Sequence, residues 1–273
     1  MAKPKGKSQV EDEAPPVALK GVRRALAVLE HIAVHPGRAT DIAADLGLSW
    51  ATLHRTLSEL EQGGFLQRAP DSNRYGIGPR LWLIGTAYLA GHQVLEAARP
   101  YLETAAGHDD IVVQLVERAD RYAVTLYSHQ TSDETITKAD YGHHFPLHCG
   151  AKGQVLLAYA PAPFIDAFLD GPLEMMAPQT MTDPETLRER LDQIRANGYA
   201  QTEGDVQIFT GSIAAPVWDR DGQAVAVVSF IGRKSVFRDE ARAELLLESL
   251  LTMAQSISIG LGWRPSDGRA GSG

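Results

Sequence analysis

The stretch GHHFPLHCGAKG, residues 142–153, contains three histidines and the only cysteine of the chain. Imidazole and thiolate groups are common zinc ligands, and a zinc site usually needs about four ligands at short spacings. His144, His148 and Cys149 could meet on one side of a helix, but a Phe-Pro pair lies between them and disfavours helical geometry. No histidine or cysteine follows Cys149 to complete a ligand set. The pattern therefore favours other uses of these residues over a metal site.

The same stretch could also supply a nucleophile. A catalytic cysteine needs a base, a group that orients the base, and donors that stabilise an oxyanion. Cys149 and its neighbour His148 provide part of such a set. A Cys/His-dependent enzyme is therefore one interpretation of the stretch.

A third interpretation starts from the small residues after the cysteine. The segment GAKG, residues 150–153, leads into QVLLAYA, which predicts a helix that ends near Pro161. The first N–H groups of a helix have no partner within the helix, and the helix dipole favours an anion beside them. A plain helix start packed on a sheet is the simpler alternative. We favour a site for the carboxylate of a ligand.

The composition indicates what kind of protein carries this stretch. A chain of 273 residues with 44% apolar content exceeds the usual size of one domain. One cysteine excludes an internal disulfide framework, and no apolar run approaches the roughly 20 residues that span a bilayer. The first residues have no apolar core typical of a signal peptide. We expect a cytoplasmic protein of two domains, without a membrane partner and without a cofactor.

The N-terminal part predicts a helix-turn-helix. The segment LKGVRRALAVLEHIAVH places Val22, Leu26, Leu29 and Ile32 at helical spacing, so we expect this stripe to face inward. Thr40 or Asp41 can begin a second, short helix, which ends at a glycine turn. A third helix would follow, with three leucines facing inward.

The third helix resembles a DNA-recognition helix. Ser49 can form its N-cap, and an outward-facing Trp near its start needs a partner that a DNA groove can supply. After two glycines, FLQRAP and RYGIG surround turn-forming residues and predict a hairpin with Arg68 and Arg74 on or beside it. Helix, glycine turn, capped helix and basic hairpin in this order indicate a winged helix-turn-helix. The net charge is +2 over residues 1–91 and −10 over the remainder, which is compatible with a nucleic-acid partner for the N-terminal part.

The rest of the chain alternates strands and helices. Residues 79–106 predict an apolar helix in two pieces, which we expect to pack against the C-terminal domain or a second subunit. Further on, DIVVQLVER and YAVTLYSH predict a strand pair, Asp183 and Pro184 begin a helix, and SIAAPVWD and QAVAVVSFIG form a hairpin before a long closing helix. The expected fold class is α+β, with an antiparallel sheet covered by helices.

Over residues 22–262 the chain resembles the IclR-type transcriptional regulators. The resemblance rests on VRRALAVLE, DIAADLGLSWATLHRTLSELEQGGFL, RYGIGPRLWLIG, PLHCGAKGQVLLA, GYAQTEGD and SIAAPVWDRDGQAVAVVSF. It implies a winged helix-turn-helix domain over 19–78, a linker helix over 79–92 and a GAF-like effector-binding domain over 93–262, with flexible tails at 1–18 and 263–273. It also implies homodimers or homotetramers on double-stranded DNA with palindromic operators, and a small-molecule effector, often an organic acid.

Site residues follow from the resemblance position by position. The expected DNA-binding residues are Arg24, Ser49, Trp50, Thr52, His54, Arg55 and Arg74. The expected effector-binding residues are Phe145, His148, Cys149, Gly150, Ala151, Lys152, Thr202, Ser212, Ser229 and Ile231, with the effector acid on the amides of Ala151 and Lys152.

Two departures from the family pattern bear on the ligand. Ile231 replaces a hydroxyl and Phe145 lies near the rim, which favours a ligand with more apolar or aromatic surface. Gln154 stands where the family has a lysine, so we expect either that dipoles more than a cation hold the acid or that the effector is not an anion. The alternative to a ligand-responsive regulator is a Cys/His-dependent enzyme or metalloprotein with an accessory winged-helix DNA module.

Overall fold

The computed structural model describes residues 21–104, 110–130 and 145–264. Contacts divide the chain into two compact units, one up to Ala87 and the other from Tyr88 onward. Most of both predicted tails, together with His143 and His144, lies outside the described residues. In the described ranges no helix is long and apolar enough to cross a membrane.

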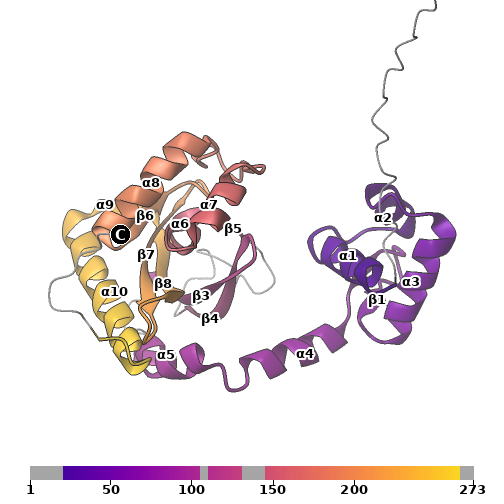
Figure 1. Ribbon diagram of the computed structural model, residues 1–273, viewed down its shortest axis with the longest axis horizontal. Helices are drawn as coiled ribbons and strands as arrows, with labels where there is room; N and C mark the ends of the chain where they lie inside the picture. The colour runs from indigo at the N-terminus through magenta and orange to yellow at the C-terminus, as the bar shows by residue number, and fades with distance from the viewer. Residues whose placement is uncertain (1–20, 105–109, 131–144, 265–273) are drawn as a thin grey trace, which may run out of the picture. The chain divides into compact units, whose positions relative to one another are not determined.

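The N-terminal unit contains three helices and a two-stranded sheet (Figure 1). Its core is a cluster of buried side chains from all three helices and both strands, with Ile32, Leu53, Leu57 and Leu66 among its members. Strands β1 and β2 are antiparallel, as the predicted wing requires. The elements are α1 (Gly21–Val34), α2 (Ala39–Asp45), α3 (Trp50–Gln62), β1 (Leu66–Arg68) and β2 (Tyr75–Ile77).

The buried stripe of α1 differs from the predicted one. Val22 and Leu26 are 75% and 51% exposed, whereas Val28 and Ile32 are fully buried. The prediction was wrong about the first half of the helix because Val28 and Ile32, four residues apart, define the inward face. Val22 and Leu26 lie to one side of that face and leave apolar surface exposed.

The cap of α3 is as predicted, and the start of α2 is not. The Ser49 side chain accepts a hydrogen bond from the Thr52 N–H at 3.4 Å. Helix α2 begins at Ala39, so neither Thr40 nor Asp41 precedes it. Asp41 instead accepts a hydrogen bond from the Arg38 N–H at 3.4 Å. Its position in the first turn lets its carboxylate reach back to the residue that precedes the helix.

Close backbone contacts hold the wing against α3. A Cβ atom on Gly78 would lie 2.3 Å from the Gly64 carbonyl oxygen, so only glycine fits where β2 passes this bend. The Tyr75 N–H donates to the Gly37 carbonyl at 2.8 Å and connects the wing to the turn between α1 and α2. The wing is therefore anchored at both ends.

Two helices connect the wing to the C-terminal sheet. Helix α4 (Pro79–Leu89) contains no buried residue, and Trp82, Leu83, Ile84 and Tyr88 are each more than half exposed. Helix α5 (Gln93–Thr104) is the second of the two predicted helical pieces and buries Leu95 and Leu102.

The C-terminal unit is built on one antiparallel sheet of six strands in the order β5-β4-β3-β8-β7-β6. The two predicted strand pairs, β3 with β4 and β7 with β8, form its centre. The strands are β3 (Ile111–Ala119), β4 (Tyr122–Gln130), β5 (Phe145–Pro146), β6 (Ala200–Glu203), β7 (Thr210–Trp218) and β8 (Ala224–Arg233).

Helices cover both faces of the sheet (Figure 1). Helices α5 and α10 (Glu240–Gly260) pack on one face, and α6 (Gly150–Ala158), α7 (Ala162–Leu169) and α8 (Pro184–Asn197) enclose the core on the other. Helix α8 has the predicted Asp183 cap and ends at Gly198, which has a φ of +78°. The prediction of an antiparallel α+β domain is confirmed, although β5, β6, α7 and the short α9 (Lys234–Arg238) were not predicted.

Candidate functional site

The start of α3 presents the predicted DNA-reading side chains. Trp50 is 54% exposed and its ring lies 5.7 Å from that of His54, one turn later. The side chain of Arg55 is 80% exposed and pairs with Glu59 at 3.0 Å. The buried leucines face the other way, so Trp50, His54 and Arg55 form one accessible surface at the N-terminal end of the helix.

Two of the predicted DNA-binding arginines also hold the unit together. The Arg24 Nε donates to the Thr56 hydroxyl at 3.0 Å and thereby connects α1 to α3. The Arg74 guanidinium donates to the Pro36 carbonyl and connects the wing to the turn after α1. Both contacts orient the guanidinium groups, and Arg74 remains exposed.

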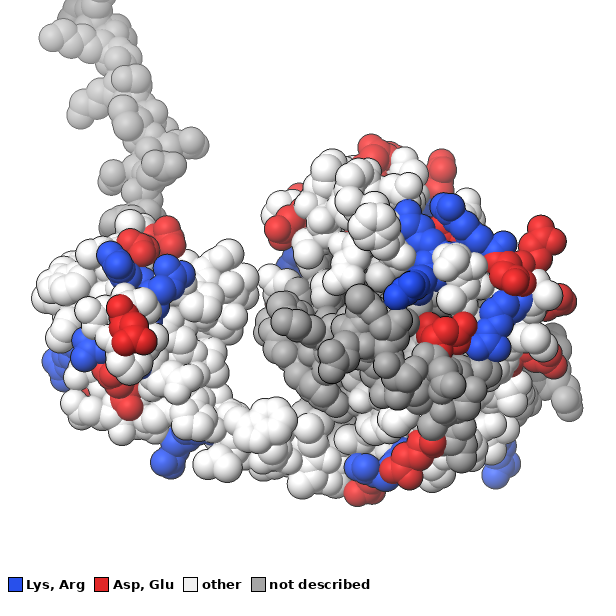
Figure 2. Space-filling model, turned by 180° about the vertical axis from the view of Figure 1, so that it is seen from behind, with Lys and Arg blue, Asp and Glu red and all other residues white. Residues whose placement is uncertain are grey.

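Acidic and basic side chains alternate on the face of the N-terminal unit drawn in Figure 2. A large uniform positive surface is therefore absent from that face, in agreement with the small net charge of the segment. Binding to DNA would depend on the few oriented side chains of α3 and the wing more than on bulk attraction.

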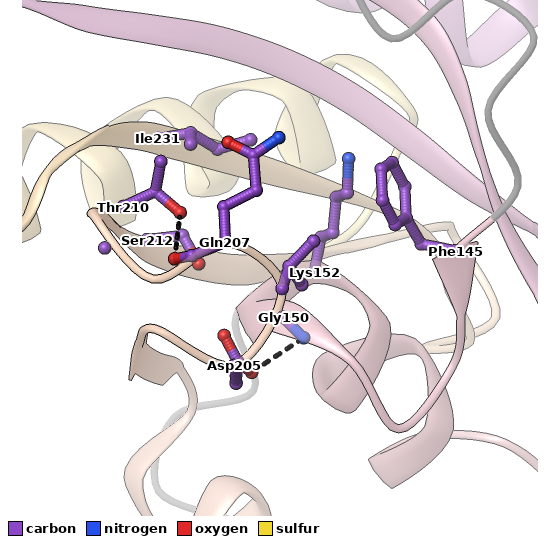
Figure 3. A pocket seen from close by; sticks show the side chains of 10 residues that line it. Phe145, Gly150, Lys152, Asp205, Gln207, Thr210, Ser212 and Ile231 are labelled. Carbon is purple, nitrogen blue, oxygen red and sulfur yellow. Dashed lines mark hydrogen bonds between the residues drawn. The ribbon is translucent and has the colours of Figure 1, made fainter. Parts of the chain in front are cut away.

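A cavity of about 440 Å³, counting the space at its open mouth, lies beside the first turn of α6 (Figure 3). The part that the centre of a water molecule can enter is only about 40 Å³, below the usual range for small-molecule sites of about 300–1,000 Å³, so the cavity is narrow in this state and a ligand would have to widen it. Five of the ten predicted effector residues line it, namely Phe145, Gly150, Lys152, Ser212 and Ile231. The other lining residues are Asp205, Val206, Gln207, Thr210 and Gly211.

The N–H groups at the start of α6 already have partners within the chain. The Gly150 N–H donates to the Asp205 carboxylate at 2.8 Å, and the Ala151 N–H donates to the Ser212 hydroxyl at 3.3 Å. Gly150 has a φ of +70°, which favours glycine and turns its N–H toward Asp205. The helix end therefore binds a carboxylate of the protein itself, and the placement of an effector acid on the Ala151 and Lys152 amides stays a prediction.

The cavity contains a cation, Lys152. Lys152 is only 6% exposed, its Nζ donates to the Gln114 side chain at 2.8 Å, and it lies 4.8 Å from the centre of the Phe145 ring. Gln154 removes one positive charge near the pocket, as noted from the sequence, but the Lys152 ammonium group lies in the lining of the cavity (Figure 3).

Asp205 gives the cavity its second charge. It is 8% exposed, and burial raises the pKa of its carboxyl above the ordinary value, although hydrogen bonds from Gly150 and Thr202 oppose that shift. Lys152 and Asp205 line the same cavity as the apolar side chains of Phe145 and Ile231. Lys152 and the two apolar side chains suit a ligand with one acidic group and an apolar body, whereas an ionised Asp205 would oppose the acidic group.

Two further predicted effector residues support the cavity without lining it. The Thr202 and Ser212 hydroxyl oxygens lie 3.0 Å apart, so Thr202 orients a lining residue. Ser229 is fully buried and donates to the Ile213 carbonyl at 3.2 Å. This hydrogen bond connects β8 to β7, and the Ser229 hydroxyl does not face the cavity.

His148 and Cys149 are also buried away from this cavity. The His148 Nε2–H donates to the Glu174 carbonyl at 2.8 Å, and burial lowers the pKa of the ring. Cys149 is fully buried, and burial raises the pKa of its thiol to about 12. Since the thiolate is the nucleophilic form, Cys149 is not an activated nucleophile. Within the ranges the structure describes, no three His, Cys, Asp or Glu side chains gather in a metal-binding geometry.

Sequence reasoning missed Asp205, Gln114 and Gln207. The segment GYAQTEGD was noticed as a family motif, but one sequence cannot show that its final aspartate reaches the start of α6, which is 55 positions away. Gln114 lies in the β3 sequence IVVQLVER, where a lone glutamine among buried apolar residues was the available signal.

Comparisons with known proteins agree for both units. Residues 21–70 match the family model of the IclR helix-turn-helix domain, and residues 86–259 match that of the bacterial transcriptional regulator IclR C-terminal domain. The chain is 30% identical over 248 residues to the glycerol operon regulatory protein of Streptomyces coelicolor, covering 89% of this chain and 97% of that protein. It is 28% identical over 259 residues to the transcriptional repressor AllR of Klebsiella pneumoniae, covering 92% and 94%.

Solved structures show the same fold. A putative IclR-type regulator from Silicibacter sp. TM1040 superposes with a TM-score of 0.75 at 23% identity, over 89% of this chain and 96% of that one. An IclR homologue from Microbacterium hydrocarbonoxydans, solved in complex with 4-hydroxybenzoate, superposes with a TM-score of 0.69 at 26% identity, over 88% and 98%. These matches are to transcriptional regulators, and they give no support to an enzyme.

Proposed function

The chain belongs to the IclR family of ligand-responsive, DNA-binding transcriptional regulators, and we propose that its α6 cavity binds a small carboxylic acid with an aromatic or similarly apolar body. The observation that carries the proposal is the single cavity shared by Lys152 and the start of α6 with Phe145 and Ile231. The ammonium group and the helix end favour an anion, whereas the two apolar side chains favour a ring. The Microbacterium homologue was solved in complex with 4-hydroxybenzoate, an acid of this chemical class, which supports the proposal.

The DNA-binding half of the proposal rests on α3 and the wing. Trp50, His54 and Arg55 would reach base edges in a major groove, while Arg24 and Arg74 would hold phosphates. Ser49 and Thr52 stabilise the start of α3 through their mutual hydrogen bond of 2.8 Å. In the proposed complex they would lie beside the DNA. Contact with only one half-site would be weak, so we propose a homodimer or homotetramer on a palindromic operator.

Effector binding would regulate transcription through a change between two states. A ligand shifts such an equilibrium only by its difference in affinity for the two states. We propose that the occupied and empty cavities favour different separations of the two winged helices, so that one state fits both half-sites. A neighbouring catabolic operon is the proposed target, and the repressor name of the AllR relative favours repression as the default state.

The test of the cavity is a titration of the full chain with 4-hydroxybenzoate, followed by calorimetry and thermal unfolding. A ligand that binds only the folded state raises the unfolding temperature. The variant Lys152→Met is expected to lose affinity by roughly 10-fold to 100-fold, because a hydrogen bond to a charged group contributes about 1.5–3 kcal/mol. The control Arg188→Gln removes a cation that pairs with Asp166 on the surface and should bind like wild type.

Two results would contradict the proposal. One is the absence of binding to the wild-type chain by 4-hydroxybenzoate and by benzoate. The other is equal affinity of the wild-type chain and the Lys152→Met variant, since the acid would then lie elsewhere.

A further inference from the structure

A second, basic depression adjoins the mouth of the α6 cavity. It is lined by Gln207, Phe209, Thr210, Arg233, Lys234, Ser235 and Arg238, and it encloses about 1190 Å³ including the space open to solvent. We call these residues the basic groove. Gln207 and Thr210 line both the groove and the cavity, so the two spaces are neighbours.

Backbone contacts build the groove from segments that are apart in the sequence. The start of β7 pairs with the end of β8, with Thr210 opposite Arg233. The Lys234 N–H donates to the Phe209 carbonyl at 3.0 Å and fixes α9 to the loop before β7. The basic side chains therefore lie on a frame that also holds one wall of the cavity.

The lining of the groove is basic. Three of its described lining residues are Arg or Lys and none is acidic. Two of these cations, Arg233 and Arg238, already have partners in the chain, and Arg238 pairs with Glu203 at 3.0 Å, so the proposal depends mainly on Lys234. On the larger unit, Figure 2 shows Lys and Arg side chains with Asp and Glu side chains beside them on the drawn face. An anionic group is the complementary ligand, because Arg and Lys donate charge-assisted hydrogen bonds to phosphate and carboxylate oxygens.

The Lys234 ammonium group lies close to Gly204, between the basic groove and the cavity. A Cβ atom on Gly204 would lie 3.3 Å from the Lys234 Nζ, and Gly204 directly precedes the cavity residue Asp205. Phe209 is 80% exposed at the same edge and offers an apolar surface beside the cations. A ligand that leaves the cavity past Gln207 and Thr210 would thus meet Lys234 and Phe209 next.

We propose that the natural effector extends from the α6 cavity into the basic groove and carries a second anionic group there. The inference rests on the proposed function, since it places the first acidic group of the effector at Lys152. The effector class is an apolar or aromatic acid whose far end carries a phosphate or a second carboxylate. A monoacid fills the cavity but leaves the groove unused.

The experiment compares 4-hydroxybenzoate with its phosphate monoester, which differ only in the group that would reach the groove. Calorimetric titrations use the full chain at low salt, where exposed charges are least screened. The wild-type chain should bind the ester at least about 10-fold more tightly than the parent acid. The double variant Lys234→Gln/Arg238→Gln should lose this gain and keep its affinity for 4-hydroxybenzoate, whereas Arg188→Gln should keep both.

The other possible results separate a failure of the groove proposal from a failure of the effector proposal. Binding of both ligands with equal affinity to the wild-type chain refutes the groove alone, as does a gain that survives in the double variant. A double variant that loses self-association in sedimentation, with no gain for the ester in wild type, assigns the groove to contact with a second copy instead. Failure of the wild-type chain to bind either ligand refutes the effector proposed above and this extension with it.

Discussion

Arg55 is expected to contribute little to the stability of the fold and more to DNA affinity. Its side chain is 80% exposed, and its contact with Glu59 is a surface ion pair of the kind that contributes at most about 1 kcal/mol to stability. A contact with a base or phosphate at the same position would contribute about 1–3 kcal/mol to DNA affinity. The two roles can be separated by mutation.

The Arg55→Ala variant is expected to weaken operator binding by roughly 10-fold to 100-fold with little change in unfolding temperature. Gel-shift titration measures the first quantity and thermal unfolding the second. Gln62→Ala, at the far end of α3, is the matched control and should bind as wild type. Unchanged affinity in Arg55→Ala would remove α3 from the DNA contact.

Asp205 makes the cavity sensitive to pH. Because burial raises its pKa in the folded state, the folded chain favours the protonated carboxyl more than the unfolded chain does. The free energy of unfolding should therefore fall as the pH rises from the ordinary value of an aspartate, about 3.9, through the folded pKa. Urea unfolding at a series of pH values should show this decline in the wild-type chain and a flatter profile in Asp205→Asn.

The same residue should oppose the binding of an acid. An effector carboxylate would compete with Asp205 for the Gly150 N–H, and the two negative charges would repel each other. We expect Asp205→Asn to bind 4-hydroxybenzoate more tightly than wild type at neutral pH, with less dependence on pH. Weaker binding by this variant would mean that the Asp205 carboxylate contacts the ligand directly.

Local sequence signals located some site residues and missed others. Ser49 was predicted because a helix cap is signalled within a few positions, and Lys152 was predicted from its position in the family motif at the start of a helix. Asp205 and Gln114 were missed because they meet α6 through tertiary contacts that span 55 and 38 positions. Lys152 was found for its amide, while the direction of its side chain depends on Gln114 and Phe145.

At the scale of elements, helix ends were predicted better than helix faces. Asp183 and Gly198 define α8 because capping residues act within one turn. The face of α1 was assigned from spacing alone, and the choice between Val22-Leu26 and Val28-Ile32 depends on where α3 packs. The short strands β5 and β6 gave no periodic signal because they have only two and four residues.

The exposed apolar face of α4 leads to a prediction about assembly. Trp82 and Leu83 are 64% and 68% exposed within the chain, and we propose that a second copy covers them. Burial of each such side chain contributes about 1.5–3 kcal/mol, so Trp82→Ser/Leu83→Ser should weaken self-association by roughly 100-fold or more. Sedimentation at several concentrations measures the shift toward monomer. Unchanged association in the double variant would place the interface elsewhere.

Across the whole molecule, the proposed regulation couples two chemically different units. The N-terminal unit has oriented basic side chains on α3 and the wing, and the C-terminal unit has a small charged cavity beside α6. Neither site alone makes a switch, because a coupling free energy requires that occupancy of one changes the affinity of the other.

The most direct test of this account measures operator affinity with the cavity filled and empty. Fluorescence anisotropy would follow the full chain on labelled DNA from the region upstream of its neighbouring operon, with and without saturating 4-hydroxybenzoate. The account predicts that the ligand changes the DNA dissociation constant of the wild-type chain by about 10-fold or more, a coupling of about 1.4 kcal/mol, and that Lys152→Met needs a higher ligand concentration for the same change. Equal DNA affinity with and without bound ligand in the wild-type chain would contradict it.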